Sequence, residues 1–215
     1  MLQSVFFGRF APLLHPVINY SPGPENKPFQ FLVVGVYNGA RCAELLSRFK
    51  SRKIPVKFYG FDLFEDLTQE KNFQEFGKRY LPPSLLAVES LFLGHGFSQE
   101  EFQLIKGDST VTLPEFFAKN PSLRLDMIFI DGGHSLETIR SDWEHCSRHL
   151  ADSGVIFLDD YYDERSDVGC KLLVEELCRS SDWSCRIGKE KAVERGLDGQ
   201  MITIRMVEVR KVPKT

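Results

Sequence analysis

The sequence is poor in cysteine, in long apolar runs and in excess charge of either sign. Its five cysteines are scattered and none stands in a Cys-x-x-Cys pair, so we expect neither a disulfide framework nor a zinc site. No run of about 18 apolar residues could span a bilayer, and the segment Met1–Val17 lacks a signal-peptide pattern. We therefore expect a cytoplasmic protein with no membrane partner.

The charge is nearly balanced, with 27 basic and 30 acidic side chains and a net charge of −3. Because nucleic-acid-binding proteins usually present a strongly basic face, no nucleic-acid partner is expected. The 215 residues suit a single domain over 1–215, in which residues 1–28 form an N-terminal extension. We expect its first part, Met1–Pro12, to pack on the sheet; the alternatives are that this part covers the active site or contacts a second subunit. A homodimer is compatible with the sequence, which fixes no oligomeric state.

Apolar runs of strand length alternate with helical patterns, which is typical of an α/β fold with a parallel sheet between helices. The expected strands are Phe29–Gly35, Val56–Phe61, Phe102–Ile105, Leu125–Ile130, Val155–Leu158 and, in an alternating and antiparallel pattern, Met201–Val209. The expected helices are Ala40–Lys50, Ser135–Leu150 with Ser135 as N-cap, and Val168–Arg179. Residues 63–99 are too long for a simple crossover and hold five of the 18 Phe residues. They form either a lid-like insertion or an extra pair of helices packed on the sheet.

Ligands of parallel sheets bind beyond the carboxyl ends of the strands, so the residues that follow each strand are the site candidates. The first strand runs into the turn Gly35–Gly39, where glycine lets the backbone approach a ligand closely. Asp62 follows the second strand and can accept hydrogen bonds from ribose hydroxyls. Because the chain has no G-x-G-x-x-G pattern, a nicotinamide dinucleotide is less favoured than another adenosine cofactor.

Three aspartates follow two strands that we expect to be neighbours. Asp131 and Asp159 are 28 residues apart, the length of one βαβ unit, and Asp160 is next in the chain. Three close carboxylates repel one another unless a cation neutralises them, and all-oxygen ligation favours Mg²⁺ or Mn²⁺. His134, which follows Asp131 across two glycines, suits a general base. The alternatives are a helix-capping or solvent-facing role for each single aspartate and an ordinary helix-start position for His134.

The segments FLVVGVYNGA, FYGFD, GDS, IFIDGGHSLETIRSDWEH and SGVIFLDDYY resemble, in this order, class I S-adenosylmethionine-dependent methyltransferases. Within that class they are most similar to the small metal-dependent O-methyltransferases that include the macrolide and aminocoumarin sugar methyltransferases. The resemblance covers Phe29–Tyr162. It implies a single-domain, Rossmann-like fold with a seven-stranded, mostly parallel sheet, helices on both faces and an antiparallel last strand.

The resemblance also implies a role for each candidate residue. The cofactor would contact Gly35, Tyr37, Asn38 and Gly39 with its methionine portion, Asp62 with its ribose, and Asp108 and Ser109 with its adenine. Asp131, Asp159 and Asp160 match the metal ligands, and His134 matches the catalytic base. Asp131 is also expected at the cofactor and, with His134, in catalysis. Val33 is a departure, because the family usually has an acidic residue there that contacts the methionine amino group.

We therefore expect an S-adenosylmethionine-dependent O-methyltransferase. Mg²⁺ or Mn²⁺ would assist methyl transfer to a hydroxyl of a small-molecule diol, either a sugar or a catechol-like ring. Val33 favours the alternative of a non-catalytic binding or scaffold protein with the methyltransferase fold. A metal-dependent hydrolase without a nucleotide cofactor would leave Gly35–Gly39 and Asp62 unexplained.

Overall fold

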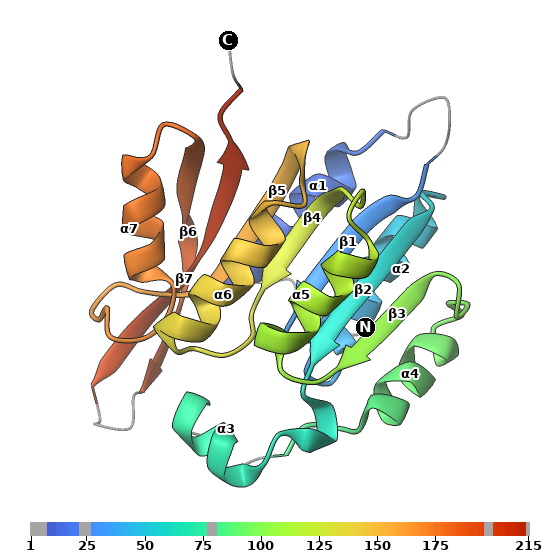
Figure 1. Cartoon of the computed structure of the whole chain (residues 1–215), viewed down its shortest axis with the longest axis horizontal. Helices are drawn as coiled ribbons and strands as arrows, with labels where there is room; N and C mark the ends of the chain where they lie inside the picture. Colours follow the sequence, from blue (N-terminus) through green and yellow to red (C-terminus); the bar gives the residue numbers. More distant parts are fainter. Residues whose placement is uncertain (1–7, 22–26, 77–80, 196–199, 214–215) are drawn as a thin grey trace.

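A seven-stranded sheet organises the computed structural model, which describes residues 8–21, 27–76, 81–195 and 200–213 (Figure 1). The strand order is β3-β2-β1-β4-β5-β7-β6. β7 is antiparallel to both of its neighbours, β5 and β6, and the other neighbouring pairs are parallel. The strands are β1 Phe29–Val34, β2 Val56–Asp62, β3 Phe102–Lys106, β4 Leu125–Ile130, β5 Leu150–Tyr162, β6 Trp183–Arg195 and β7 Met201–Lys211. The expected seven-stranded sheet with an antiparallel last strand is confirmed.

Helices cover both faces of the sheet (Figure 1). One face carries α1 Leu14–Asn19, α2 Ala40–Ser51 and α4 Leu85–Gly94, and the other carries α5 Ser109–Lys119, α6 Leu136–Ser147 and α7 Lys171–Arg179. Alternate residues of β1 serve the two cores: Phe31 and Val33 face the first set of helices, and Leu32 and Val34 face the second. Burial on both faces explains why this strand is a continuous apolar run.

Several element boundaries differ from the sequence prediction for local reasons. Ser135 caps α6 as expected, since its side chain accepts a hydrogen bond from the Thr138 amide, but the helix ends at Ser147 because Leu150 already begins β5. α7 begins at Lys171, beyond Gly169, whose φ of +78° is not helical. The sequence analysis missed β6 and α5. β6 is a charged edge strand, and α5 carries a proline at position 114.

The 63–99 segment forms helices, and its role as a lid stays a prediction. It contains η2 Phe64–Asp66, α3 Gln69–Phe76 and α4. Phe64, Phe92 and Phe97 are buried in the core, so three of the five phenylalanines of this segment have a packing role. α3 instead lies beyond the strand ends, and Phe73 on it is 42% exposed (Figure 1). The side chain of Phe76 and all of Tyr80 lie outside the described residues, and closure of this segment over a ligand stays a prediction.

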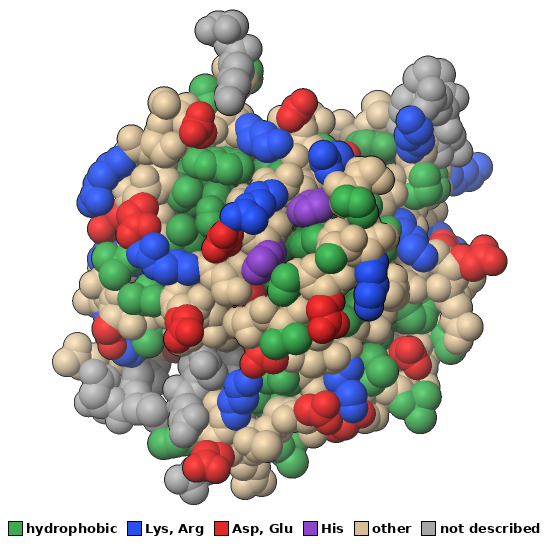
Figure 2. Space-filling model, in the orientation of Figure 1, with side chains coloured by type: hydrophobic (Ala, Val, Ile, Leu, Met, Phe, Trp, Pro, Cys, Tyr) green, Lys and Arg blue, Asp and Glu red, His purple; other side chains and the backbone are tan. Residues whose placement is uncertain are grey.

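The N-terminal extension packs against the sheet through η1 Gly8–Leu13 and α1. Leu13 and Val17 are buried in the core that also holds β1. In the part of the chain that the structure describes, no helix is long and apolar enough to cross a membrane. Basic and acidic side chains are interspersed over the face seen in Figure 2.

Candidate active site

A cavity of about 810 Å³ lies at the carboxyl ends of the parallel strands. The site candidates that line it are Gly35, Tyr37, Asn38, Asp62, Asp108, Ser109, Asp131, His134 and Asp160. Gly39 and Asp159 do not line it. Gly39, at φ +72°, faces α4, where a Cβ would lie 2.7 Å from Val88 Cγ1, and the Asp159 side chain is fully buried. Glu194 of β6 with Ile202 and Ile204 of β7 forms a further wall.

The turn after β1 forms one end of the cavity because Gly35 lets two strand ends meet. Gly35 has φ +90°, and a Cβ there would lie 1.9 Å from the carbonyl oxygen of Asp131. The Tyr37 amide donates to Asp62 Oδ2 at 2.7 Å, and the Phe64 amide donates to Asp62 Oδ1 at 2.8 Å. Burial raises the pKa of Asp62, and these backbone hydrogen bonds oppose the rise in part. A carboxylate accepts hydrogen bonds, so Asp62 in the cavity wall suits hydroxyl donors of a ligand.

Asp108 stabilises two neighbouring helices at the next strand end. Its carboxylate caps α5 by accepting from the Thr110 amide at 3.1 Å, and it pairs with Lys71 Nζ of α3 at 2.7 Å. The hydrogen bond from Lys71 lowers the pKa of Asp108. Lys71 itself had no sequence signal, because its partner lies 37 residues along the chain.

Asp142 of α6 is a fully buried carboxyl behind the cavity wall, between Ser109 and Gly132. Burial raises its pKa from 3.8 to about 7, against a smaller lowering by the Ser109 hydroxyl. The raised pKa means that the folded protein keeps this proton up to about pH 7, whereas the unfolded chain releases it near pH 4. The stability contributed by the protonated form is therefore complete below about pH 4 and is lost as the pH rises through 7.

We expect Asp142→Asn, which stays neutral at every pH, to gain stability over the wild type as the pH rises. Between pH 5 and pH 8 the difference in free energy of unfolding should shift toward the variant by about 2 to 3 kcal/mol. Urea denaturation at the two pH values measures the shift. Asp152→Asn, at an exposed position, is the control. A pH-independent difference for Asp142→Asn would show that the Asp142 carboxyl is not held protonated.

The structure brings Asp131, Asp159 and Asp160 together at the ends of β4 and β5. One oxygen from each carboxylate lies within 4.8 Å of the others. Burial and the negative charge of Asp159 raise the pKa of Asp131. Three convergent, desolvated carboxylates are donors that suit a hard divalent cation such as Mg²⁺ or Mn²⁺. The residues present thus fit the metal that the sequence resemblance implies.

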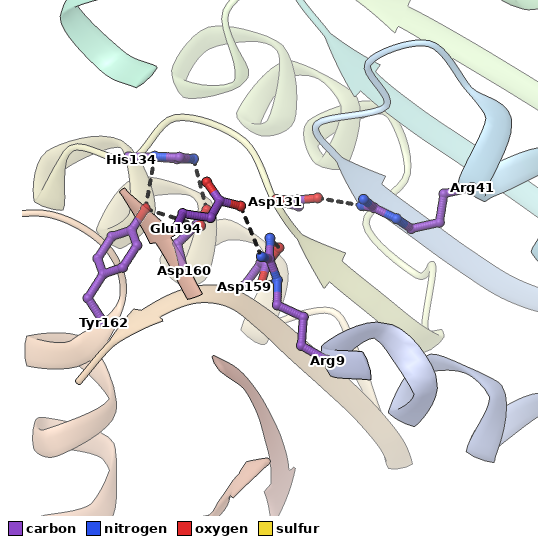
Figure 3. Close-up of polar contacts among 8 residues, drawn as sticks. All are labelled: Arg9, Arg41, Asp131, His134, Asp159, Asp160, Tyr162 and Glu194. Atoms are coloured by element: carbon purple, nitrogen blue, oxygen red, sulfur yellow. Dashed lines mark hydrogen bonds and ion pairs between the residues drawn. The ribbon is translucent and has the colours of Figure 1, made fainter. Parts of the chain in front are cut away.

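Two arginines that the sequence analysis missed also pair with these carboxylates (Figure 3). Arg41 of α2 donates from Nη1 to Asp131 Oδ2 at 2.7 Å. Arg9 of η1 donates from Nε and Nη2 to the two oxygens of Asp159, at 3.0 and 2.8 Å. The position of Arg41, two residues after the glycine turn, could have marked it as a site candidate. No sequence pattern pointed to Arg9, because 150 residues separate it from Asp159.

Asp160, the third aspartate, contacts the imidazole of His134 (Figure 3). His134 Nε2 lies 2.8 Å from Asp160 Oδ2, and the Tyr162 hydroxyl donates to Asp160 Oδ1 at 3.1 Å. Tyr162 Oη also lies 3.2 Å from His134 Nδ1. Asp160 has φ +58°, and the Cys170 amide donates to its carbonyl oxygen at 3.1 Å. The loop before α7 therefore fixes the strained backbone that aims this carboxylate at the imidazole.

A family model described as a methyltransferase domain matches residues 32–161, which is more than half of the chain. The chain belongs to this methyltransferase family. The match spans β1 to β5, including the glycine turn, Asp62 and the three aspartates, and it confirms the class I methyltransferase resemblance seen in the sequence. No curated protein matches the methyltransferase significantly in sequence.

Solved structures share the fold of this methyltransferase at low sequence identity. The O-methyltransferase NovP is 17% identical, with a TM-score of 0.66 over 94% of this chain and 77% of NovP. CalS11, a TDP-rhamnose 3′-O-methyltransferase of calicheamicin biosynthesis, is 16% identical, with a TM-score of 0.59 over 91% of this chain and 76% of its own. PaMTH1, an SAH-bound methyltransferase of Podospora anserina, is 15% identical, with a TM-score of 0.53 over 88% and 74%.

Proposed function

We propose that this enzyme transfers a methyl group from S-adenosylmethionine to a hydroxyl of a small-molecule diol, either a sugar or a catechol-like ring. The observation that carries the proposal is one cavity that joins the Asp62 carboxylate to the Asp160–His134 pair. Asp62 suits a ribose, and an imidazole held by a carboxylate suits a base that removes a hydroxyl proton. NovP and CalS11, which share the fold, are O-methyltransferases, and CalS11 acts on a sugar nucleotide.

The turn after β1 and the ends of β2 and β3 would hold the cofactor. S-adenosylmethionine supplies a methyl group on a sulfonium, and the SAH complex of PaMTH1 supports this cofactor for the fold. The residues assigned to it are Gly35, Tyr37, Asn38, Asp62, Asp108 and Ser109, all of which line the cavity. Val33, a buried residue at the cavity wall, provides no carboxylate for the methionine amino group. Arg41 and Asp131, which pair with each other and line the cavity, would contact the methionine carboxylate and amino groups.

The carboxylates of Asp131, Asp159 and Asp160 would hold Mg²⁺ or Mn²⁺. When bound, such an ion lowers the pKa of a nearby hydroxyl and favours an acceptor with two adjacent oxygens. That preference is the reason for proposing a vicinal diol as the acceptor.

His134 would take the proton from the acceptor hydroxyl as the carbon–oxygen bond forms and the methyl–sulfur bond of the sulfonium breaks, which releases S-adenosylhomocysteine. Asp160 accepts the hydrogen bond from Nε2 and fixes the ring, which leaves Nδ1 to accept a proton. The Tyr162 hydroxyl donates to the same carboxylate and lies beside Nδ1. A protonated Nδ1 could then donate to the Tyr162 oxygen, which would stabilise the imidazolium.

The cofactor assignment predicts that S-adenosylhomocysteine binds to the wild type and less tightly to Asp62→Asn. An uncharged amide accepts hydroxyl hydrogen bonds more weakly than a carboxylate, so we expect a loss of affinity of about tenfold or more. Isothermal titration calorimetry measures both dissociation constants. Asp66→Asn in the adjacent η2, an exposed position, is the matched control and should bind as the wild type does. Absence of binding to the wild type at millimolar ligand would contradict the proposed function.

A further inference from the structure

Arg9 provides a positive charge beside the three carboxylates of Asp131, Asp159 and Asp160, here called the carboxylate centre. Its guanidinium donates to both oxygens of Asp159, and the Arg9 side chain is only 13% exposed. Asp131 and Asp160 also act on Arg9 electrostatically, so the guanidinium interacts with all three carboxylates. A paired guanidinium of this kind is a geometrically specific, bidentate contact, unlike a solvated surface charge.

The chain's own cations thus offset the charge of the centre. Arg9 pairs with Asp159, Arg41 pairs with Asp131, and His134 lies against Asp160. A divalent cation held by all three aspartates would share Asp159 with Arg9, whose guanidinium already donates to both carboxylate oxygens. A metal ion and a guanidinium would also repel each other at this distance.

We propose that Arg9 and a divalent cation bind to Asp159 in mutually exclusive ways, so that Arg9 sets the metal affinity of the centre. The inference rests on the metal assignment made for the proposed function. Arg9 is a positioning residue in this account, because it acts through Asp159 and not on the reacting atoms. Binding of the metal requires η1 to release its guanidinium.

Phe10 extends the effect of this release to the second arginine. The Arg9 Cζ lies 4.5 Å from the centre of the Phe10 ring, and the Arg41 Cζ lies 3.7 Å from it. The same turn of η1 therefore stacks on both guanidiniums that serve the aspartates. Glu194 Oε1 of β6, 3.8 Å from Arg9 Nη1, offers a second carboxylate to the displaced guanidinium. Metal binding should consequently loosen η1 as a unit while Arg9 keeps an anionic partner.

Mn²⁺ titration of the full chain, without cofactor or acceptor, tests the inference. The signal of free Mn²⁺ in electron paramagnetic resonance measures its dissociation constant. We expect Arg9→Gln to bind Mn²⁺ about tenfold tighter or more, because the variant leaves the buried Asp159 charge without its partner. Arg9→Lys should fall between the two, since an ammonium cannot engage both oxygens as the planar fork does. Arg140→Gln, which removes an exposed bidentate pair with Glu176, is the matched control and should bind as the wild type does.

Hydrogen exchange of the wild type gives a second measurement that needs no variant. Mn²⁺ should raise exchange of the backbone amides of residues 8–13 and leave those of α7 unchanged. Equal Mn²⁺ affinities for wild type and Arg9→Gln, unaltered exchange at 8–13, or no Mn²⁺ binding by folded Arg9→Gln would each overturn the inference. S-adenosylhomocysteine titration of the same samples separates the two proposals, because retained binding leaves the methyltransferase assignment standing when the Arg9 inference fails.

Discussion

Gly35→Ala should unfold the cofactor end of the cavity and remove S-adenosylhomocysteine binding. The new methyl group would lie 1.9 Å from the Asp131 carbonyl oxygen and 2.9 Å from the Gly132 amide nitrogen, both of which are backbone atoms. The ends of β1 and β4 would have to separate, and an alanine at φ +90° adds backbone strain. We expect a loss of at least about 3 kcal/mol in free energy of unfolding, measured by urea denaturation, and a loss of affinity of more than about a hundredfold.

Gly94→Ala is the matched control for this prediction. Gly94 ends α4, and a Cβ built there meets no heavy atom within 4 Å. Its substitution should change the free energy of unfolding by less than about 1 kcal/mol, toward greater stability. If Gly35→Ala bound S-adenosylhomocysteine like Gly94→Ala, the close approach of the two strand ends would not be what shapes the cofactor turn.

His134→Gln should lower kcat by about a hundredfold to ten-thousandfold, the range expected for loss of a positioned general base. Affinity for S-adenosylhomocysteine should stay within about threefold of the wild type, because the proposed function assigns His134 to the acceptor and not to the cofactor. The measurement is transfer of labelled methyl from S-adenosylmethionine to catechol and to a free sugar with adjacent hydroxyls. Repeating it with EDTA reports whether the divalent cation is required.

His145→Gln is the control, since His145 lies in the last turn of α6 and does not line the cavity. It should leave kcat unchanged. A His134→Gln enzyme with a kcat within about threefold of the wild type would exclude His134 as the base, whatever its effect on stability.

The sequence predicted the parallel half of the sheet well because strands buried on both faces are continuous apolar runs, as in β1 and β4. The residues after those strands were predictable for the same reason, since parallel strands place their carboxyl ends at one edge. Asp62 and the three aspartates were found in this way. β6 was not predicted, because an edge strand with charged and exposed residues lacks a continuous apolar run.

Contacts between distant segments were beyond the reach of local patterns. Arg9 and Lys71 join the site from η1 and α3, and no spacing rule connects them to Asp159 or Asp108. Asp142 was missed for a different reason. Its position on α6 looked like an ordinary polar helix residue, yet packing against the cavity wall buries it completely.

The hairpin of β6 and β7 has a consequence for how this enzyme could diversify. Glu194, Ile202 and Ile204 reach the cavity from the end of the chain, whereas the turn at Gly35 and the Asp62 carboxylate come from its first third. Under the proposed function, the cofactor contacts of the first third and the cavity wall formed by the hairpin are therefore encoded in separate stretches of sequence. Natural variation or directed evolution confined to the hairpin could alter which molecule is methylated while leaving the donor contacts intact.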